Sequence, residues 1–117
     1  MEQVRIFHNP RCSKSREALA LLEARGVAAE VIEYLSTPPS LGELQALLAL
    51  LKRPARELLR SGEDEYTALN LADPGLSDVQ LLSAITAHPR LLQRPIVVRG
   101  QRAVIARPPE LLQSLFD

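Results

Sequence analysis

The stretch VRIFHNPRCSKSREALALLEARG, residues 4–26, predicts how the chain begins to fold. Residues 4–8 form a short apolar run that is typical of a buried strand. Residues 14–25 place apolar side chains at helical spacing, and the glycine that follows is the residue that commonly ends a helix. We therefore expect a strand, a short loop and a helix, with the only cysteine of the chain, Cys12, in the loop.

The rest of the chain extends this start into an α/β fold. Residues 29–35 predict a second strand, which completes a βαβ unit. Two capping boxes, at residues 40–43 and 77–80, predict helices in the middle of the chain. The last predicted elements are a strand opened by Pro95, its hairpin partner at residues 102–107 and a helix at residues 108–116. The outer pieces, βαβ and ββα, match a thioredoxin/glutaredoxin-like fold with a four-stranded mixed sheet. The helices at about residues 40–90 form an insertion within a single domain of residues 1–117.

The composition argues against several classes of protein. Apolar residues make up 46% of the chain, which argues against disorder. The longest apolar run, residues 46–51, is far too short to span a bilayer, and the N-terminal residues show no secretory signal. A formal net charge of zero argues against a nucleic-acid surface. We expect a cytoplasmic protein with neither nucleic acid nor membrane as a partner.

The position of Cys12 favours an ionised thiol. The first N–H groups of a helix lack intrahelical partners and carry the positive end of its dipole, so they favour a thiolate or a bound anion. Three nearby cations, Arg11, Lys14 and Arg16, are expected to be solvated and to add positive potential at most. The alternative is a small buried apolar cysteine, which would have apolar neighbours that this loop lacks. We predict a reactive thiolate.

The residues at fixed spacings from Cys12 limit the classes of cysteine-dependent protein to which the chain could belong. Residues 12–15, CSKS, are the Cys-x-x-Ser form of a dithiol redox motif. The anion loop of tyrosine phosphatases needs an arginine six positions after the cysteine, where this chain has Ala18. A single cysteine forms no intramolecular disulfide, so a second thiol must come from another molecule. The sequence has no Cys/His cluster that offers a zinc site, and His8 and His88 are alone in their segments. We also expect no bound cofactor.

At this point the segment IFHNPRCSKSR, residues 6–16, resembles the active-site segment of the glutaredoxin-coupled arsenate reductases of the ArsC family. The resemblance continues in the same order through YLSTPPS, ELLR, HPRLLQRPIVV and ARPPE, over nearly the whole chain. Dedicated arsenic-resistance members commonly have Gly-Thr where this chain has Ser13 and Lys14. The segment NPRCSKSR, residues 9–16, therefore looks more like that of the housekeeping branch of ArsC-like proteins. The family fold is thioredoxin-like with a helical insertion.

The resemblance implies a role for six residues. Cys12 would attack arsenate or a similar oxyanion, and His8 and Ser15 would support its thiolate. The oxyanion would be held by three arginines, Arg60, Arg94 and Arg107. Glutathione would act as co-substrate and glutaredoxin as the partner that regenerates the thiol. A proline that faces the thiol is usually cis in such folds, and Pro95 is the candidate.

Other interpretations stay open from the residues alone. Arg60, near a helix C-terminus, is favourable there as a solvated cation, and His8 fits a hydrogen-bonded core histidine. One alternative function is a non-enzymatic regulator like the Spx-type proteins, which share this fold and bind RNA polymerase. Those proteins usually carry Cys-x-x-Cys, whereas this chain has Ser15. Another is a monothiol oxidoreductase acting on glutathionylated substrates. We expect an arsenate reductase that serves arsenic detoxification.

Overall fold

The computed structural model describes residues 2–117, whose contacts form two compact units. The first unit comprises the chain up to Thr37 together with Arg94–Asp117, and the second is Pro38–Gln93. The first unit holds the strands, and the second consists of helices and turns. The expectation of a single domain over residues 1–117 stays a prediction.

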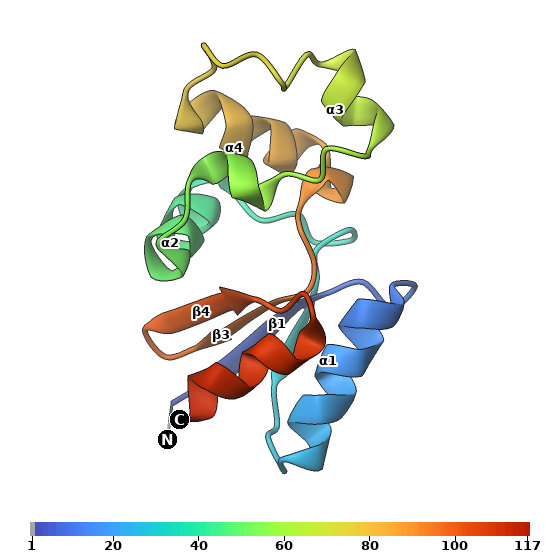
Figure 1. Cartoon of the computed structure of the whole chain (residues 1–117), viewed down its shortest axis with the longest axis vertical. Coiled ribbons are helices and arrows are strands. Elements are labelled where there is room, and N and C mark those ends of the chain that lie inside the picture. Colours follow the sequence, from blue (N-terminus) through green and yellow to red (C-terminus); the bar gives the residue numbers. More distant parts are fainter. Residues whose placement is uncertain (1) are drawn as a thin grey trace. The chain divides into compact units, whose positions relative to one another are not determined.

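A four-stranded sheet in the order β2-β1-β3-β4 forms the centre of the first unit (Figure 1). The strands are β1 (Val4–His8), β2 (Glu30–Glu33), β3 (Ile96–Arg99) and β4 (Arg102–Ile105). Strand β1 pairs parallel with β2 and antiparallel with β3, and β3 pairs antiparallel with β4. This mixed sheet confirms the predicted thioredoxin-like fold. Gly100 lies in the turn between β3 and β4 and takes a positive φ of 57°, which glycine tolerates.

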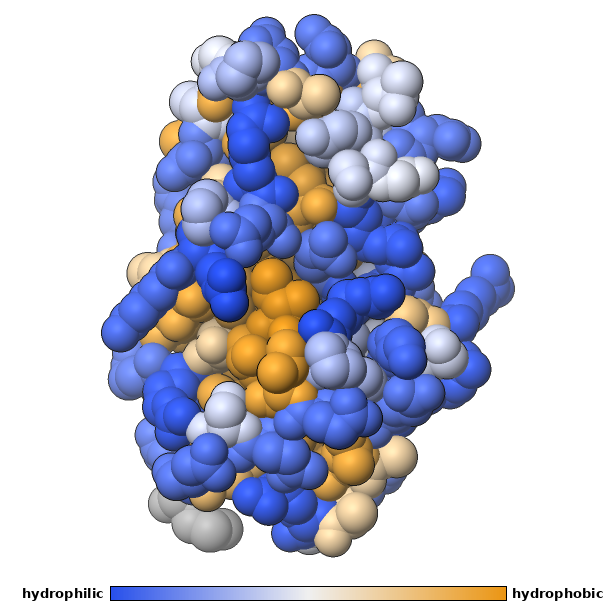
Figure 2. Space-filling model, viewed as in Figure 1, coloured by the Kyte–Doolittle hydropathy of each residue, from blue (hydrophilic) through white to orange (hydrophobic). Residues whose placement is uncertain are grey.

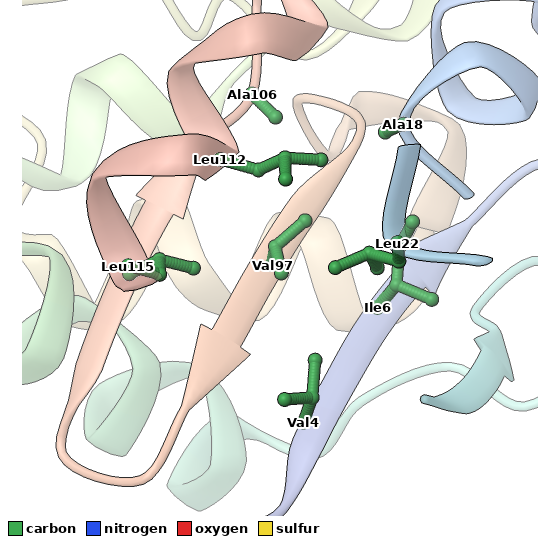
Figure 3. Packing of buried hydrophobic residues seen from close by; sticks show 8 residues of the cluster. All are labelled: Val4, Ile6, Ala18, Leu22, Val97, Ala106, Leu112 and Leu115. Carbon is green, nitrogen blue, oxygen red and sulfur yellow. The ribbon is translucent and has the colours of Figure 1, made fainter. Parts of the chain in front are cut away.

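Two helices of the first unit lie on one face of its sheet (Figure 1). They are α1 (Ser13–Ala24) and the 3-10 helix η3 (Pro109–Phe116). Their apolar side chains meet those of β1 and β3 in one cluster (Figure 3), which consists of Val4, Ile6, Ala18, Leu22, Val97, Ala106, Leu112 and Leu115. The predicted C-terminal end of α1 is confirmed, because Gly26 takes the left-handed φ of 76° that glycine tolerates best.

The second unit contains the helices α2 (Leu41–Leu51), η1 (Ala55–Leu58), α3 (Asp64–Ala68), α4 (Asp78–Ala87) and η2 (Pro89–Leu91). Both predicted capping boxes are present. The Ser40 hydroxyl accepts the Glu43 N–H at 3.1 Å, and the Glu43 carboxylate accepts the Ser40 N–H at 3.1 Å. Ser77 and Gln80 exchange the same pair of bonds. Helices α2 and α4 pack together and bury leucines from both.

One predicted element is shorter than expected. The strand predicted at residues 29–35 ends at Glu33, because the Glu33 carbonyl accepts the N–H groups of Ser36 and Thr37 at 3.0 Å each and turns the chain. On the face drawn in Figure 2, hydrophilic side chains cover most of the surface and apolar ones show between them. None of the helices within residues 2–117 combines the length and the hydropathy that crossing a membrane requires.

Candidate active site

The loop between β1 and α1 is held by hydrogen bonds that centre on Asn9. The Asn9 carbonyl accepts the Cys12 N–H at 3.0 Å, and its side-chain oxygen accepts the Arg11 N–H at 3.0 Å. The Asn9 N–H in turn donates to the Ser15 hydroxyl at 3.3 Å. Sequence reasoning assigned Asn9 no role, although asparagine commonly bonds to the backbone two residues on in turns. This network fixes the position of Cys12, which is the N-cap residue of α1.

Two further side chains hold the loop. Ser15 is fully buried, and its hydroxyl accepts a bond from Asn9 rather than facing solvent. The Arg16 guanidinium donates to the Pro10 carbonyl at 2.9 Å. We expected Arg16 to be solvated; it is exposed, but it also ties the start of the loop to the first turn of α1. Lys14 lies at the surface, 3.7 Å from the Glu17 carboxylate.

The pKa of the Cys12 thiol reflects opposing effects. Burial works against ionisation and raises the pKa. Hydrogen bonds from the Ser15 N–H, the Arg94 side chain and the Lys14 N–H act in the opposite direction, and the Arg94 charge adds to them. Together they outweigh burial and lower the pKa to about 7. Cys12 is therefore about half ionised at neutral pH, as an attacking thiolate requires.

His8 lies at the end of β1 and is only 5% exposed. Its Nδ1 is buried without a hydrogen-bond partner, which differs from the hydrogen-bonded core histidine considered above. Burial lowers the pKa of His8, Glu33 opposes this, and Arg16 adds to the lowering. The ring is thus mostly neutral at pH 7 and adds little positive charge beside the thiol. Its part in thiolate formation stays a prediction, and would rest on hydrogen bonding.

Two of the three predicted arginines are brought together in the first unit. The Arg94 side chain hydrogen-bonds the Cys12 sulfur. The Nε of Arg94 is buried without a hydrogen-bond partner, so this N–H is available to donate to a ligand. The Arg107 guanidinium donates to the Arg94 carbonyl at 3.0 Å. Both arginines precede cis peptide bonds, to Pro95 and Pro108, which confirms the candidate cis proline and adds a second.

Arg60 belongs to the second unit, where it is held within a group of charges. Its guanidinium lies 3.3 Å from the Glu63 carboxylate, which also lies 3.4 Å from Arg90. The Arg60 side chain is about one quarter exposed, and the backbone N–H of Arg60 donates to the Leu91 carbonyl at 2.7 Å. Sequence reasoning missed Glu63, although a spacing of three residues from Arg60 is a signal for such a pair. The oxyanion-binding role of Arg60 stays a prediction.

Comparison with known proteins identifies the family. The model of the ArsC family matches residues 7–115. The chain belongs to the ArsC family. An arsenate reductase of Neisseria meningitidis is 49% identical to this ArsC protein over 117 residues, which cover 99% of this chain and 100% of that one. The uncharacterized protein YfgD of Escherichia coli is 53% identical over 93% of this chain and 92% of its own.

Solved structures agree with the ArsC assignment. The arsenate reductase from Vibrio cholerae has a TM-score of 0.94 and 48% identity, over 97% of each chain. Among the residues described in this ArsC protein, no three His, Cys, Asp or Glu side chains gather so that they could hold a metal ion. The chemistry available at the site is that of one activated thiol beside fixed cationic donors.

Proposed function

We propose that this ArsC protein is a cytoplasmic arsenate reductase of the glutaredoxin type. One observation carries the proposal: the thiol of Cys12, with its pKa lowered to about 7, is hydrogen-bonded by the Arg94 guanidinium. A nucleophile and a donor for an oxyanion are thus held together before any substrate arrives. The names of the relatives described above support arsenate as the oxyanion.

In the first step, the Cys12 thiolate attacks arsenic. An As–S bond forms and an arsenate oxygen leaves as water after protonation. Arsenate is an anion and the attack adds the charge of the thiolate to it. Arginines that donate to its oxygens therefore stabilise the transition state more than they stabilise the bound arsenate. Arg94 and Arg107 supply these donors, while the N–H groups of Ser15 and Lys14 hold the sulfur in place.

In the second step, a thiol from outside the chain completes the reduction. The chain has one cysteine, so glutathione supplies the next thiolate. It attacks the Cys12 sulfur, an S–S bond forms, and the electron pair of the As–S bond goes to arsenic, which leaves as arsenite. A thiolate of glutaredoxin then attacks the glutathione sulfur of this disulfide. A new S–S bond forms between glutaredoxin and glutathione, the bond to Cys12 breaks, and Cys12 leaves as a thiolate. Two thiols have been oxidised to a disulfide and arsenic has gained two electrons.

The test is a coupled assay with NADPH, glutathione reductase, glutathione and glutaredoxin. We expect NADPH oxidation that depends on arsenate and that is lost in Cys12→Ser. Omission of glutaredoxin should stop turnover after the mixed disulfide with glutathione has formed on Cys12, which intact-protein mass spectrometry detects. If arsenate produces no signal above that of Cys12→Ser, the chain is not an arsenate reductase.

A further inference from the structure

A pocket of about 320 Å³ adjoins the loop that carries Cys12, at the carboxyl ends of the parallel strands β1 and β2. It is lined by residues 8–11, Glu33, Leu35 and Ser36. Its volume is within the range of small-molecule sites, about 300–1,000 Å³, and open α/β sheets commonly bind ligands at such strand ends. The oxyanion site described above uses Arg94 and Arg107, neither of which lines this pocket.

The lining combines opposite charges with uncharged groups. Arg11 and Glu33 are both exposed, and each comes from a different segment of the chain. No salt bridge between their side chains is present, so both charges remain available to a ligand. His8, which is opposite Glu33 in the strand register, is buried and neutral. Leu35 adds an exposed apolar side chain.

We propose that this pocket seats glutathione, with Glu33 binding the γ-glutamyl ammonium and Arg11 binding a carboxylate of the peptide. A zwitterionic peptide presents both charges that the pocket complements, and its methylene groups can lie against Leu35. The loop that lines the pocket with residues 9–11 continues directly into Cys12, so a peptide held there lies beside the residue with which its thiol must react. The inference names the co-substrate site of the proposed function and so rests on it.

The seating can be tested without arsenate. Glutathione disulfide reacts with the Cys12 thiolate to form the Cys12–glutathione disulfide, while the original S–S bond breaks and one glutathione thiolate leaves. We would measure this rate by mass spectrometry and divide it by the rate with hydroxyethyl disulfide, which is small and uncharged. The ratio cancels changes in the reactivity of Cys12 itself and in the folding of the loop.

We expect Arg11→Gln and Glu33→Gln each to lower this ratio by roughly three- to tenfold, the effect of losing one partly exposed charged hydrogen bond. The sign for Glu33 is decisive. Glutathione disulfide is a net anion, so without specific seating the loss of a carboxylate would raise its rate rather than lower it. Arg25→Gln and Glu30→Gln, which remove exposed charges of the first unit outside the pocket, should leave the ratio within twofold, a margin of about 0.4 kcal/mol.

A ratio that rises in Glu33→Gln, or that falls equally in Arg11→Gln and Arg25→Gln, would overturn the pocket as a glutathione site. These outcomes are independent of arsenate reduction, because the oxyanion takes no part in the exchange. If the ratio falls in both pocket variants and stays unchanged in the controls, but arsenate is not turned over, the result would support the pocket as a glutathione site and contradict the proposed reductase. Normal arsenate turnover with an unchanged ratio in both pocket variants would do the reverse.

Discussion

At Cys12, burial and hydrogen bonding act on the thiol in opposite directions. Burial alone would keep the thiol protonated at neutral pH, and it is the largest single effect on its pKa. The donors that reverse it come from two sources: the backbone at the start of α1, and the Arg94 side chain just before β3. The reactivity of this residue therefore depends on a tertiary contact as well as on the helix N-terminus.

The effect of the Arg94 side chain on the Cys12 thiol can be measured from the pH dependence of Cys12 alkylation. Thiolate is the reactive form, so the rate with iodoacetamide should rise with pH and reach half its maximum at about pH 7. Arg94→Gln removes a hydrogen bond and a positive charge that favour the thiolate, so it should move the midpoint upward. A wild-type midpoint at or above about 8.5, the value for free cysteine, would show that the loop does not activate the thiol.

Removing an oxyanion donor should reduce arsenate turnover strongly. Arg94→Ala and Arg107→Ala are each expected to lower kcat/KM for arsenate by about a hundredfold in the coupled assay. Arg53→Ala is a suitable control, because Arg53 is exposed and pairs with the exposed Glu57. It should remain within twofold of wild type, and a similarly small effect in both Arg94→Ala and Arg107→Ala would remove them from the site.

At the scale of elements, the helices of the second unit depend on their N-terminal caps. In α4, the Ser77 hydroxyl accepts the Gln80 N–H at 3.2 Å, and the Gln80 side chain accepts the Ser77 N–H at 2.8 Å. We expect Ser77→Ala to lower the free energy of unfolding by about 1 kcal/mol, measured by urea denaturation. Ser83 is exposed within the same helix and caps nothing, so Ser83→Ala should be neutral or slightly stabilising. Equal effects in both variants would argue against the capping box.

The segment that leads into α3 offers a test of Arg60. Glu63 lies 3.3 Å from Arg60 and competes with any anion for its guanidinium. If Arg60 binds arsenate, Glu63→Gln should lower the KM for arsenate by up to about fivefold, as expected for an ion pair of about 0.2–1 kcal/mol. Glu57→Gln removes the partner of an arginine outside the proposed site and should leave KM unchanged. An unchanged KM in Glu63→Gln would argue against the role of Arg60.

At the scale of the whole molecule, stability depends on side chains that meet from distant segments. Leu112 of η3 is fully buried in the cluster shown in Figure 3, whereas its neighbour Leu111 is 45% exposed. We expect Leu112→Ala to lower the free energy of unfolding by about 2–5 kcal/mol, because it leaves a cavity. Leu111→Ala should change it by about 0.5 kcal/mol or less. Similar losses in the two variants would mean that η3 does not pack as described.

The amino-acid pattern was enough to predict the elements and their order. Capping boxes, prolines and the period of apolar residues act over a few positions, so Ser40, Ser77 and Gly26 could be assigned from their neighbours. The end of β2 was placed too late, because the turn after Glu33 depends on backbone hydrogen bonds that no side chain marks. The lone thiol at the start of α1, and with it the expectation that an outside thiol takes part, also followed from the chain itself.

The partners of that thiol followed from the folded chain. The sheet order brings β3 beside β1, and Arg94 just before β3 thereby reaches Cys12 just after β1. The lowered pKa of His8 likewise depends on burial, and the hydrogen bond from Arg107 to the Arg94 carbonyl joins residues on either side of the β3–β4 hairpin. Charge and hydrogen bonding at a site depend on distances through space, and a linear pattern does not contain these distances.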